Sequence, residues 1–251
     1  MATTNGESSN LLVLVPGAWM GGWIWKDTIR RLADLGIEAT TLTLVGLEPE
    51  LPLDEVADVR LEDHVAQLVD FVRELSDVPV VLVGHSYSGI VIGQVADRVP
   101  EKVRRSIHIS SFLPRNGRSL IDDWGPDTET RRAERDQIHA DGMLWKSPPG
   151  EALGGEVDLT DSQRRWLSEH FVPHPGRTIL DPARMTHGVT SQPITFVSSA
   201  ASDADPRVDL PLEFANGTPE RWTLRTMNGG HWPMLTDPAA LVTHLVEAAN
   251  G

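Results

Sequence analysis

The chain of 251 residues contains no cysteine, which excludes disulfide bonds and thiolate metal sites. Long hydrophobic runs are also lacking. The run LLVLV at 11–15 is too short for a signal-peptide core or a membrane span, and the polar residues 1–10, which we expect to form a flexible N-terminus, hold no basic region. These absences predict a cytoplasmic protein.

Positive charge is scarce as well. The chain has 22 Lys and Arg against 36 Asp and Glu, a formal net charge of −14. Such a surface repels phosphate backbones and anionic lipid headgroups. We therefore expect neither nucleic acid nor a membrane as a partner.

What the sequence does contain is an alternation of short apolar runs with amphipathic stretches. This alternation predicts an α/β fold, with a mostly parallel central sheet flanked by helices. Strands are expected at 11–15, 40–45, 79–84, 103–110, 193–200 and 221–227. Helices are expected at 26–36, 61–75, 88–99 and 238–250.

Residues 113–192 interrupt the alternation. They carry many charges, breakers such as SPPGEALGG, and helical patterns around 128–140 and 162–171. We interpret them as an inserted cap, so that the α/β core consists of 11–112 and 193–251.

The stretch VVLVGHSYSGIVIG at 80–93 places polar residues between two apolar runs. Ser86 lies two residues after Gly84, and a helix is expected to start at once. This spacing is typical of the nucleophile elbow, whose pattern is G-x-S-x-G. Here the fifth position is Ser88, followed by Gly89. A plain strand-to-helix connection with a capping serine is the alternative for this stretch taken alone.

The loop VPGAWMGGWIW at 15–25 follows the first expected strand. Acyl transfer needs N–H donors for the developing oxyanion, and in this architecture they come from such a loop and from the residue after the nucleophile. Ala18 and Tyr87 are the matching positions for the oxyanion hole. A dinucleotide or phosphate loop is set aside, because the glycine spacing fits neither pattern.

The segment MNGGHWPMLTDP at 227–238 supplies a histidine, His231, in a glycine-lined loop. That is the expected place for the general base, although a surface histidine in a turn would look the same. The catalytic triad then lacks only its acid, which should follow the expected strand at 193–200. Asp203 is the first choice and Asp205 the alternative; either could be an ordinary loop aspartate.

Candidates for substrate binding are Gly17, Trp19, Trp124, Trp145 and Trp232. An aromatic lid over an apolar pocket suits a hydrophobic substrate. A small core within the cap is the alternative for its tryptophans.

A metal site is not expected. His170 and His174 have i,i+4 spacing, but Pro173 interrupts any helix there and no third ligand stands nearby in the sequence.

These motifs together resemble the α/β-hydrolases, and more narrowly the branch that contains plant hydroxynitrile lyases, plant methylesterases and related bacterial esterases. PGAWMGGWIW resembles the HGA-x-HGAW-x-W loop of that branch, and VLVGHSYSGIVI and GGHWPML resemble its elbow and histidine loop. The resemblance implies a helical cap inserted after the sixth strand. It also implies Ser86 as nucleophile, His231 as base, and the amides of Ala18 and Tyr87 as oxyanion hole.

Departures from the branch narrow the chemistry. Pro16 replaces the usual His of the loop, and Ser110 and Ser111 stand where bacterial relatives often have an aspartate. Hydroxynitrile lyases use a Thr and a Lys where this chain has Gly17 and Trp232. Hydrolysis is therefore favoured over that lyase reaction.

The resulting hypothesis is a serine hydrolase that cleaves a carboxylic ester or lactone of a small, largely apolar molecule through an acyl-enzyme, without a cofactor. A cyclase or lyase of secondary metabolism and a small-ligand receptor on the same fold are the alternatives. The oligomeric state is open, with a homodimer as one option.

Overall fold

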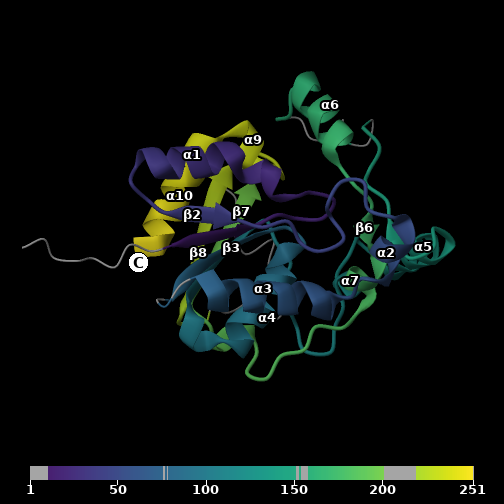
Figure 1. The fold of residues 1–251 in the computed structure, drawn as a ribbon, viewed down its shortest axis with the longest axis horizontal. Coiled ribbons are helices and arrows are strands. Elements are labelled where there is room, and N and C mark those ends of the chain that lie inside the picture. Colours follow the sequence, from purple (N-terminus) through teal and green to yellow (C-terminus); the bar gives the residue numbers. More distant parts are fainter. Residues whose placement is uncertain are drawn as a thin grey trace, which may run out of the picture.

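The computed structural model describes residues 11–75, 77, 79–150, 153, 158–200 and 219–250. Over these residues the centre is a parallel sheet of six strands in the order β2-β1-β3-β4-β7-β8 (Figure 1). The strands are β1 (Leu12–Val15), β2 (Ala39–Thr41), β3 (Val80–His85), β4 (Val103–Ile109), β7 (Ile194–Ala200) and β8 (Trp222–Asn228). The predicted fold class is confirmed.

Helices cover both faces of this sheet. One side carries α1, η1, α9 and α10, and the other carries α3 and α4 (Figure 1). Their bounds are α1 (Lys26–Asp34), α3 (Leu61–Leu75), α4 (Ser88–Arg98), α9 (Pro233–Thr236), α10 (Pro238–Asn250), with the 3-10 turns η1 (Gly22–Trp25) and η2 (Pro100–Lys102). Gly36, with φ of +73°, follows α1 as its left-handed stop.

The two-sided cover explains the uninterrupted apolar runs of the central strands. In β1, Val13 joins the hydrophobic core that includes Leu68 of α3, whereas its neighbour Leu12 joins the core that includes Leu245 of α10. The side chains of Leu12 and Val13 are both fully buried. Successive residues of a strand point to opposite faces, so a strand covered on both sides must be apolar at every position.

The second strand is shorter than predicted. A strand was expected over 40–45, but β2 ends at Thr41. The reason is a side chain from α3: Gln67 donates to the Thr43 carbonyl (3.1 Å) and accepts from the Val45 amide (2.9 Å). These bonds replace the ladder that a longer strand would make, and they turn the chain away from the sheet edge.

The segment predicted as a cap runs between β4 and β7 and lies beside the sheet, toward the right of Figure 1. Near it lies α2 (Leu53–Asp58). The segment's described elements are η3 (Leu120–Asp122), α5 (Thr128–Ala140), β5 (Leu144–Trp145), α6 (Asp161–His170), β6 (His174–Pro175), α7 (Gly176–Leu180) and η5 (Val189–Ser191). The two helices expected here are present as α5 and α6. The division into core and cap at 113 and 192 stays a prediction.

One expectation about this segment is wrong in its count. The segment follows the fourth strand of the described chain, β4, and not the sixth. Among the described residues before 113, the chain forms only β1, β2, β3 and β4, and its other apolar segments there form the helices α1, α3 and α4.

The end of the segment is fastened to α4. The buried carboxylate of Asp97 accepts hydrogen bonds from the backbone amides of Thr186 (2.5 Å) and His187 (2.9 Å). Gln94, one turn earlier on α4, accepts from the amide of Arg184 (2.7 Å). These bonds satisfy polar groups that would otherwise be buried alone, and they fix where the chain re-enters the core.

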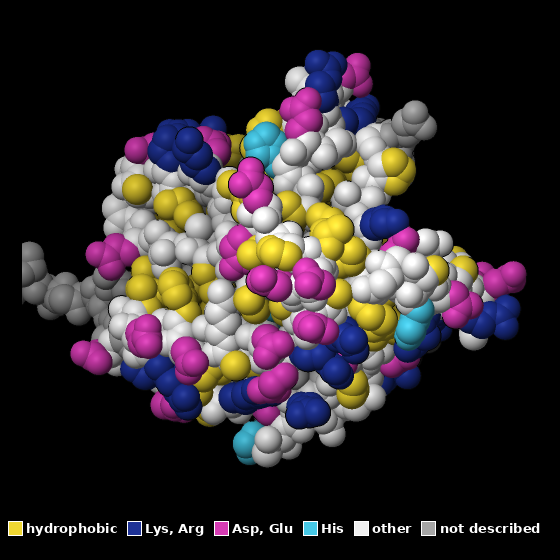
Figure 2. All heavy atoms as spheres, turned by 45° about the vertical axis from the view of Figure 1, so that its right-hand side comes forward, with side chains coloured by type: hydrophobic (Ala, Val, Ile, Leu, Met, Phe, Trp, Pro, Cys, Tyr) yellow, Lys and Arg dark blue, Asp and Glu magenta, His cyan; other side chains and the backbone are white. Residues whose placement is uncertain are grey.

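Acidic side chains spread over much of the face in Figure 2, interspersed with Arg and Lys, while hydrophobic side chains gather near its middle. In the part of the chain that the structure describes, no helix combines the length and the apolar character needed to cross a membrane.

Candidate functional site

Ser86 occupies the sharp turn between β3 and α4. Its φ is +53°, in the left-handed region that non-glycine residues rarely adopt. The strained turn is held on both sides, because the Ser86 amide donates to the Ile109 carbonyl and the Ser86 carbonyl accepts from the Phe112 amide, both at 3.1 Å. A serine strained in this way, between a strand and a helix, is the geometry of a nucleophile elbow.

Small residues around Ser86 let the strand and the helix approach closely. A Cβ on Gly84 would lie 2.7 Å from the Ile92 Cδ1 of α4. One on Gly89 would lie 2.3 Å from the Phe112 carbonyl oxygen. Neither position can take a side chain without moving backbone or core.

Ser88 explains the departure from the G-x-S-x-G pattern. Its buried hydroxyl accepts from the His85 amide at 2.8 Å and lies 2.9 Å from the Val15 carbonyl, to which it donates. The hydroxyl therefore connects the elbow to the end of β1. Serine is tolerated here because its one polar atom is fully used.

The loop after β1 lies against the elbow at Gly17. A Cβ on Gly17 would lie 2.9 Å from the Nδ1 of His85, so only glycine permits this approach. Ala18 follows, and its amide, like that of Tyr87, donates to no other described residue. The two positions predicted for an oxyanion hole thus offer amides that form no hydrogen bond within the described part of the chain.

His231 lies in the loop between β8 and α9, next to the elbow. His85, the neighbour of Ser86, donates from Nε2 to the His231 carbonyl at 2.7 Å, and the two rings are 4.7 Å apart. Burial, with a smaller contribution from His231, holds the pKa of His85 well below its usual value. His85 is therefore neutral and can keep this donor role at physiological pH.

The predicted acids, Asp203 and Asp205, lie outside the described residues. The end of β4 offers hydroxyls instead of a carboxylate: Ser110 accepts from the Ser199 amide at 3.0 Å. A carboxylate that the sequence did not single out, Asp158, contacts the histidine loop by accepting from the Gly230 amide at 2.6 Å.

The predicted substrate-binding tryptophans divide into two places. Trp19, Trp124 and Trp145 belong to one aromatic cluster, with ring centroids 4.2 Å apart for Trp19 and Trp145 and 5.1 Å for Trp124 and Trp145. Phe112, whose amide binds Ser86, stacks on Trp124 and brings this cluster beside the elbow. Trp232 instead packs in the core on the α10 side of the sheet.

Two buried histidines form a polar network under this cluster. His64 Nε2 faces the Val45 carbonyl at 2.7 Å, which can only accept, so Nδ1 carries no proton and accepts from the Tyr87 hydroxyl at 2.8 Å. Burial lowers the pKa of His64 to about 4 and raises the pKa of Tyr87. Both groups are therefore neutral at physiological pH, and the Tyr87 side chain is held next to Ser86.

His174 continues the network toward the loop after β1. Its Nδ1 accepts from the Trp19 amide at 3.4 Å, and its Nε2 donates to the Thr178 hydroxyl at 2.9 Å. Burial, together with His64, lowers the pKa of His174 well below its usual value. Trp19 has φ of +64°, so this bond supports a strained residue directly after Ala18.

Replacing Tyr87 by phenylalanine should lower the free energy of unfolding by about 1–3 kcal/mol, because the buried His64 Nδ1 loses its donor. Urea unfolding at pH 7 measures the change. Thr243→Val, which also removes a hydroxyl but on the exposed face of α10, is the control and should change stability by less than about 0.5 kcal/mol. Equal stability of Tyr87→Phe and the wild type would contradict this account of the network.

His170 and His174 have different partners in the structure. His170 caps its own helix through the Trp166 carbonyl, whereas His174 is used by Trp19 and Thr178. Among the described residues no group of His, Asp and Glu could hold a metal ion.

The network and Asp158 were missed by sequence reasoning. His64 had a usable signal, because it lies three residues after Leu61 and one before Val65, within the apolar stripe of α3. His174 and Asp158 had none, since their partners Trp19 and Gly230 are 155 and 72 residues away.

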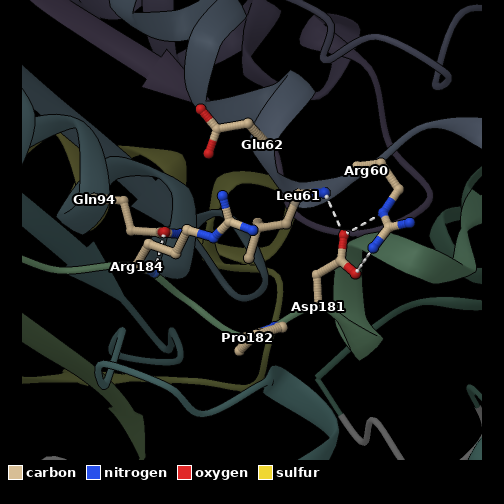
Figure 3. A pocket seen from close by; sticks show the side chains of 7 residues that line it. All are labelled: Arg60, Leu61, Glu62, Gln94, Asp181, Pro182 and Arg184. Atoms are coloured by element: carbon tan, nitrogen blue, oxygen red, sulfur yellow. Dashed lines mark hydrogen bonds and ion pairs between the residues drawn. The ribbon is translucent and has the colours of Figure 1, made fainter.

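A separate pocket of about 220 Å³ lies between the start of α3, α4 and the chain after α7. Figure 3 shows that several of its polar groups are occupied: Asp181 accepts from the Arg60 side chain and the Leu61 amide, and Gln94 accepts from the Arg184 backbone amide. Neither Ser86 nor His231 lines it. It is therefore not part of the candidate site.

Comparison with known proteins shows the family to which the chain is similar. The chain matches the model of the alpha/beta hydrolase family over residues 12–244. It is 40% identical to the carbendazim hydrolyzing esterase of Nocardioides sp. (strain SG-4G) over 111 residues, 43% of this chain and 45% of that protein. It is 32% identical to methylesterase 8 of Arabidopsis thaliana over 258 residues, 95% of this chain and 89% of that protein. The alignment with the Nocardioides protein, unlike that with methylesterase 8, spans less than half of the relative's length.

Solved structures show the same fold. An extracellular alpha/beta-hydrolase from a Paenibacillus species superposes with a TM-score of 0.77 at 20% identity, covering 95% of this chain and 98% of that one. Tomato methylketone synthase I superposes with a TM-score of 0.70 at 20% identity, covering 96% and 98%.

Proposed function

Because the chain belongs to the alpha/beta hydrolase family, on its methylesterase-like branch, we propose that it is a serine carboxylesterase. It cleaves a carboxylic ester or lactone of a small, largely apolar substrate through an acyl-enzyme. The observation that carries the proposal is the strained backbone of Ser86, with φ of +53°, at the turn between β3 and α4. Non-glycine residues held at such a φ cluster at active sites, where the strain is part of the mechanism.

The proposed reaction has two steps. His231 removes the Ser86 proton while the hydroxyl oxygen attacks the carbonyl, and the amides of Ala18 and Tyr87 bind the oxyanion. His231 then gives the proton to the leaving alkoxide, whose bond to the acyl carbon breaks. In the second step His231 activates a water that releases the acid and restores Ser86. The amides of Ala18 and Tyr87, which donate to no other described residue, support these roles.

The acid that orients His231 is Asp203 in this proposal, with Asp205 as the alternative. It would hold the imidazole in the tautomer that accepts the serine proton and would stabilise the imidazolium.

The substrate's apolar part would lie against Trp19, Trp124 and Trp145. Their cluster adjoins the elbow through Phe112, and aromatic rings bind flat apolar groups well. The names of the relatives, a carbendazim hydrolyzing esterase and a methylesterase, support an ester as the bond that is cleaved. Gly17 and Trp232 stay predicted substrate contacts.

Stopped-flow hydrolysis of p-nitrophenyl esters tests the acyl-enzyme. With acyl groups that are released slowly, we expect a burst of p-nitrophenol of about one equivalent per chain, followed by slower turnover. Added methanol should raise the steady rate and divert the acyl group into a methyl ester. The substrate class then follows from a panel of aryl esters, methyl esters and lactones.

Hydrolysis without a burst for any acyl group, and without methyl ester formation, would contradict the acyl-enzyme. Tight binding of apolar ligands with no turnover of the panel would favour a receptor instead. Serine labelling without ester turnover would favour a cyclase or lyase.

The absence of a cofactor and the cytoplasmic location stay predictions, and the oligomeric state stays open with a homodimer as one option. Activity after exhaustive dialysis against chelator, cell fractionation, and sedimentation velocity test them in turn.

A further inference from the structure

The loop that carries His231 is held from two sides. On the core side, His85 donates to the His231 carbonyl at 2.7 Å. On the other side, the carboxylate of Asp158 accepts from the Gly230 amide at 2.6 Å. Asp158 belongs to the segment between β4 and β7, so the two holding groups come from parts of the molecule that are far apart in the sequence.

The glycines before His231 are explained by this carboxylate. A Cβ on Gly230 would lie 2.3 Å from the Asp158 Oδ1 and 2.8 Å from its Cγ. Gly229 has φ of +132°, a backbone conformation that residues other than glycine rarely adopt. Two successive glycines leave the loop many conformations, so its position depends on external bonds.

The same segment makes further contacts with the loop and with α9 behind it. Gln163 of α6 donates to the Leu235 carbonyl in α9 at 2.8 Å. Leu159 packs in the hydrophobic core that contains Trp232 and Met234, the residues after His231. Asp158 is therefore the polar part of a wider contact and not an isolated bond.

We infer that Asp158 is a positioning residue for His231: its carboxylate, by accepting from the Gly230 amide, sets where the imidazole lies relative to Ser86. The inference rests on the proposed function, in which His231 is the base. A displacement of about 1 Å at a reacting group can lower a rate about 100-fold, so a loop held by few bonds makes each bond matter. The bond between Asp158 and Gly230 also connects the loop of the proposed base to the segment that is predicted to cap the site.

Asp158→Ala and Asp158→Asn separate the acceptor from the charge. Alanine removes the oxygen that binds the Gly230 amide, so kcat for a p-nitrophenyl ester should fall about 10- to 100-fold with KM changed less than about threefold. Asparagine keeps an acceptor oxygen at the same place and should restore kcat to within about threefold of the wild type. A loss that only loosened the fold would not be repaired in this selective way.

Asp161→Ala is the matched control. Asp161 lies three residues further along, its side chain is 94% exposed, and it should leave kcat unchanged. Unchanged kcat in Asp158→Ala overturns the inference. Equal losses in Asp158→Ala and Asp158→Asn overturn it too, because the charge and not the bond to Gly230 would then be required.

Gly230→Ala gives a second route if Asp158→Ala does not fold. Its Cβ must displace the Asp158 carboxylate, so kcat should fall by a similar factor, and the double variant should be no slower than the slower single one. Losses that multiply would overturn the inference. If Ser86→Ala keeps the turnover of the wild type, the proposed function itself is refuted. If Asp158→Ala keeps normal turnover and this turnover depends on Ser86, only the role of Asp158 is refuted.

Discussion

Ser86→Ala should lower kcat for p-nitrophenyl esters by about 10⁴-fold or more and leave the fold intact. The variant lacks the only atom that can form the proposed acyl-enzyme, while the oxyanion amides of Ala18 and Tyr87 and the substrate contacts remain. A backbone φ of +53° is about equally strained for serine and for alanine, so the melting temperature of the variant should differ from that of the wild type by less than about 2 °C. Initial rates with purified protein, and thermal unfolding followed by circular dichroism, measure the two quantities.

Ser88→Ala is the control for this result. Ser88 is two residues away and fully buried, but its hydroxyl is used by the Val15 carbonyl and the His85 amide. We expect it to lower the free energy of unfolding by about 1–2 kcal/mol and to lower kcat far less than Ser86→Ala. A Ser86→Ala variant with a tenth or more of wild-type activity would contradict the nucleophile assignment.

The second large effect is a loss of stability in mild acid. Four histidines are fully buried: His64, His85, His108 and His174. Burial lowers the pKa of His64 to about 4 and that of His108 to about 3, and it holds the pKa values of His85 and His174 well below the usual 6.5. All four are therefore neutral in the folded chain at pH 7.

Each of these groups binds a proton less readily when folded than when unfolded. Above pH 6.5 neither state is protonated, so their contribution to stability is fully present. As the pH falls through 6.5 the unfolded chain takes up protons first, and the free energy of unfolding drops until the folded pKa is reached near 4. At pH 5 the loss is about 2 kcal/mol for His64 alone, and the other three act in the same direction.

Such losses approach the total stability of an ordinary domain, about 5–15 kcal/mol, so we expect unfolding between about pH 6 and pH 4. Urea unfolding at pH 7, 6 and 5 gives the slope of stability against pH. His64→Gln, whose amide can still donate to the Val45 carbonyl but does not titrate, should show a shallower slope by up to about 1.4 kcal/mol per pH unit. Identical slopes for the variant and the wild type would mean that His64 is not buried neutral.

Regular structure was largely predictable because local patterns determine it. The apolar stripe of 61–75 gave α3, and the continuous apolar run of 79–84 gave the central strand β3. The second strand was overestimated because its sequence is strand-like, while the group that shortens it, Gln67, comes from another helix. A single sequence does not reveal which distant side chain will compete for a backbone ladder.

The candidate site was predictable where its chemistry is contiguous. Gly84, Ser86 and Gly89 lie in one short stretch, which predicts a strand-to-helix connection; the loops at 15–25 and 227–238 were needed to favour a nucleophile elbow over a plain turn. Contacts between distant segments were not predictable: Trp19 meets His174, and Gly230 meets Asp158, only through the tertiary fold. The acid stays a sequence prediction, since Asp203 and Asp205 lie outside the described residues.

The central claim is that the Ser86 hydroxyl is the nucleophile and that His231 activates it. Labelling with a fluorophosphonate, followed by mass spectrometry of the proteolysed chain, tests it most directly. We expect one adduct per chain, on Ser86, which forms in step with the loss of esterase activity and forms at least about 100-fold more slowly in His231→Ala. Loss of activity with Ser86 unmodified, or equally fast labelling of Ser86 in His231→Ala, would contradict it.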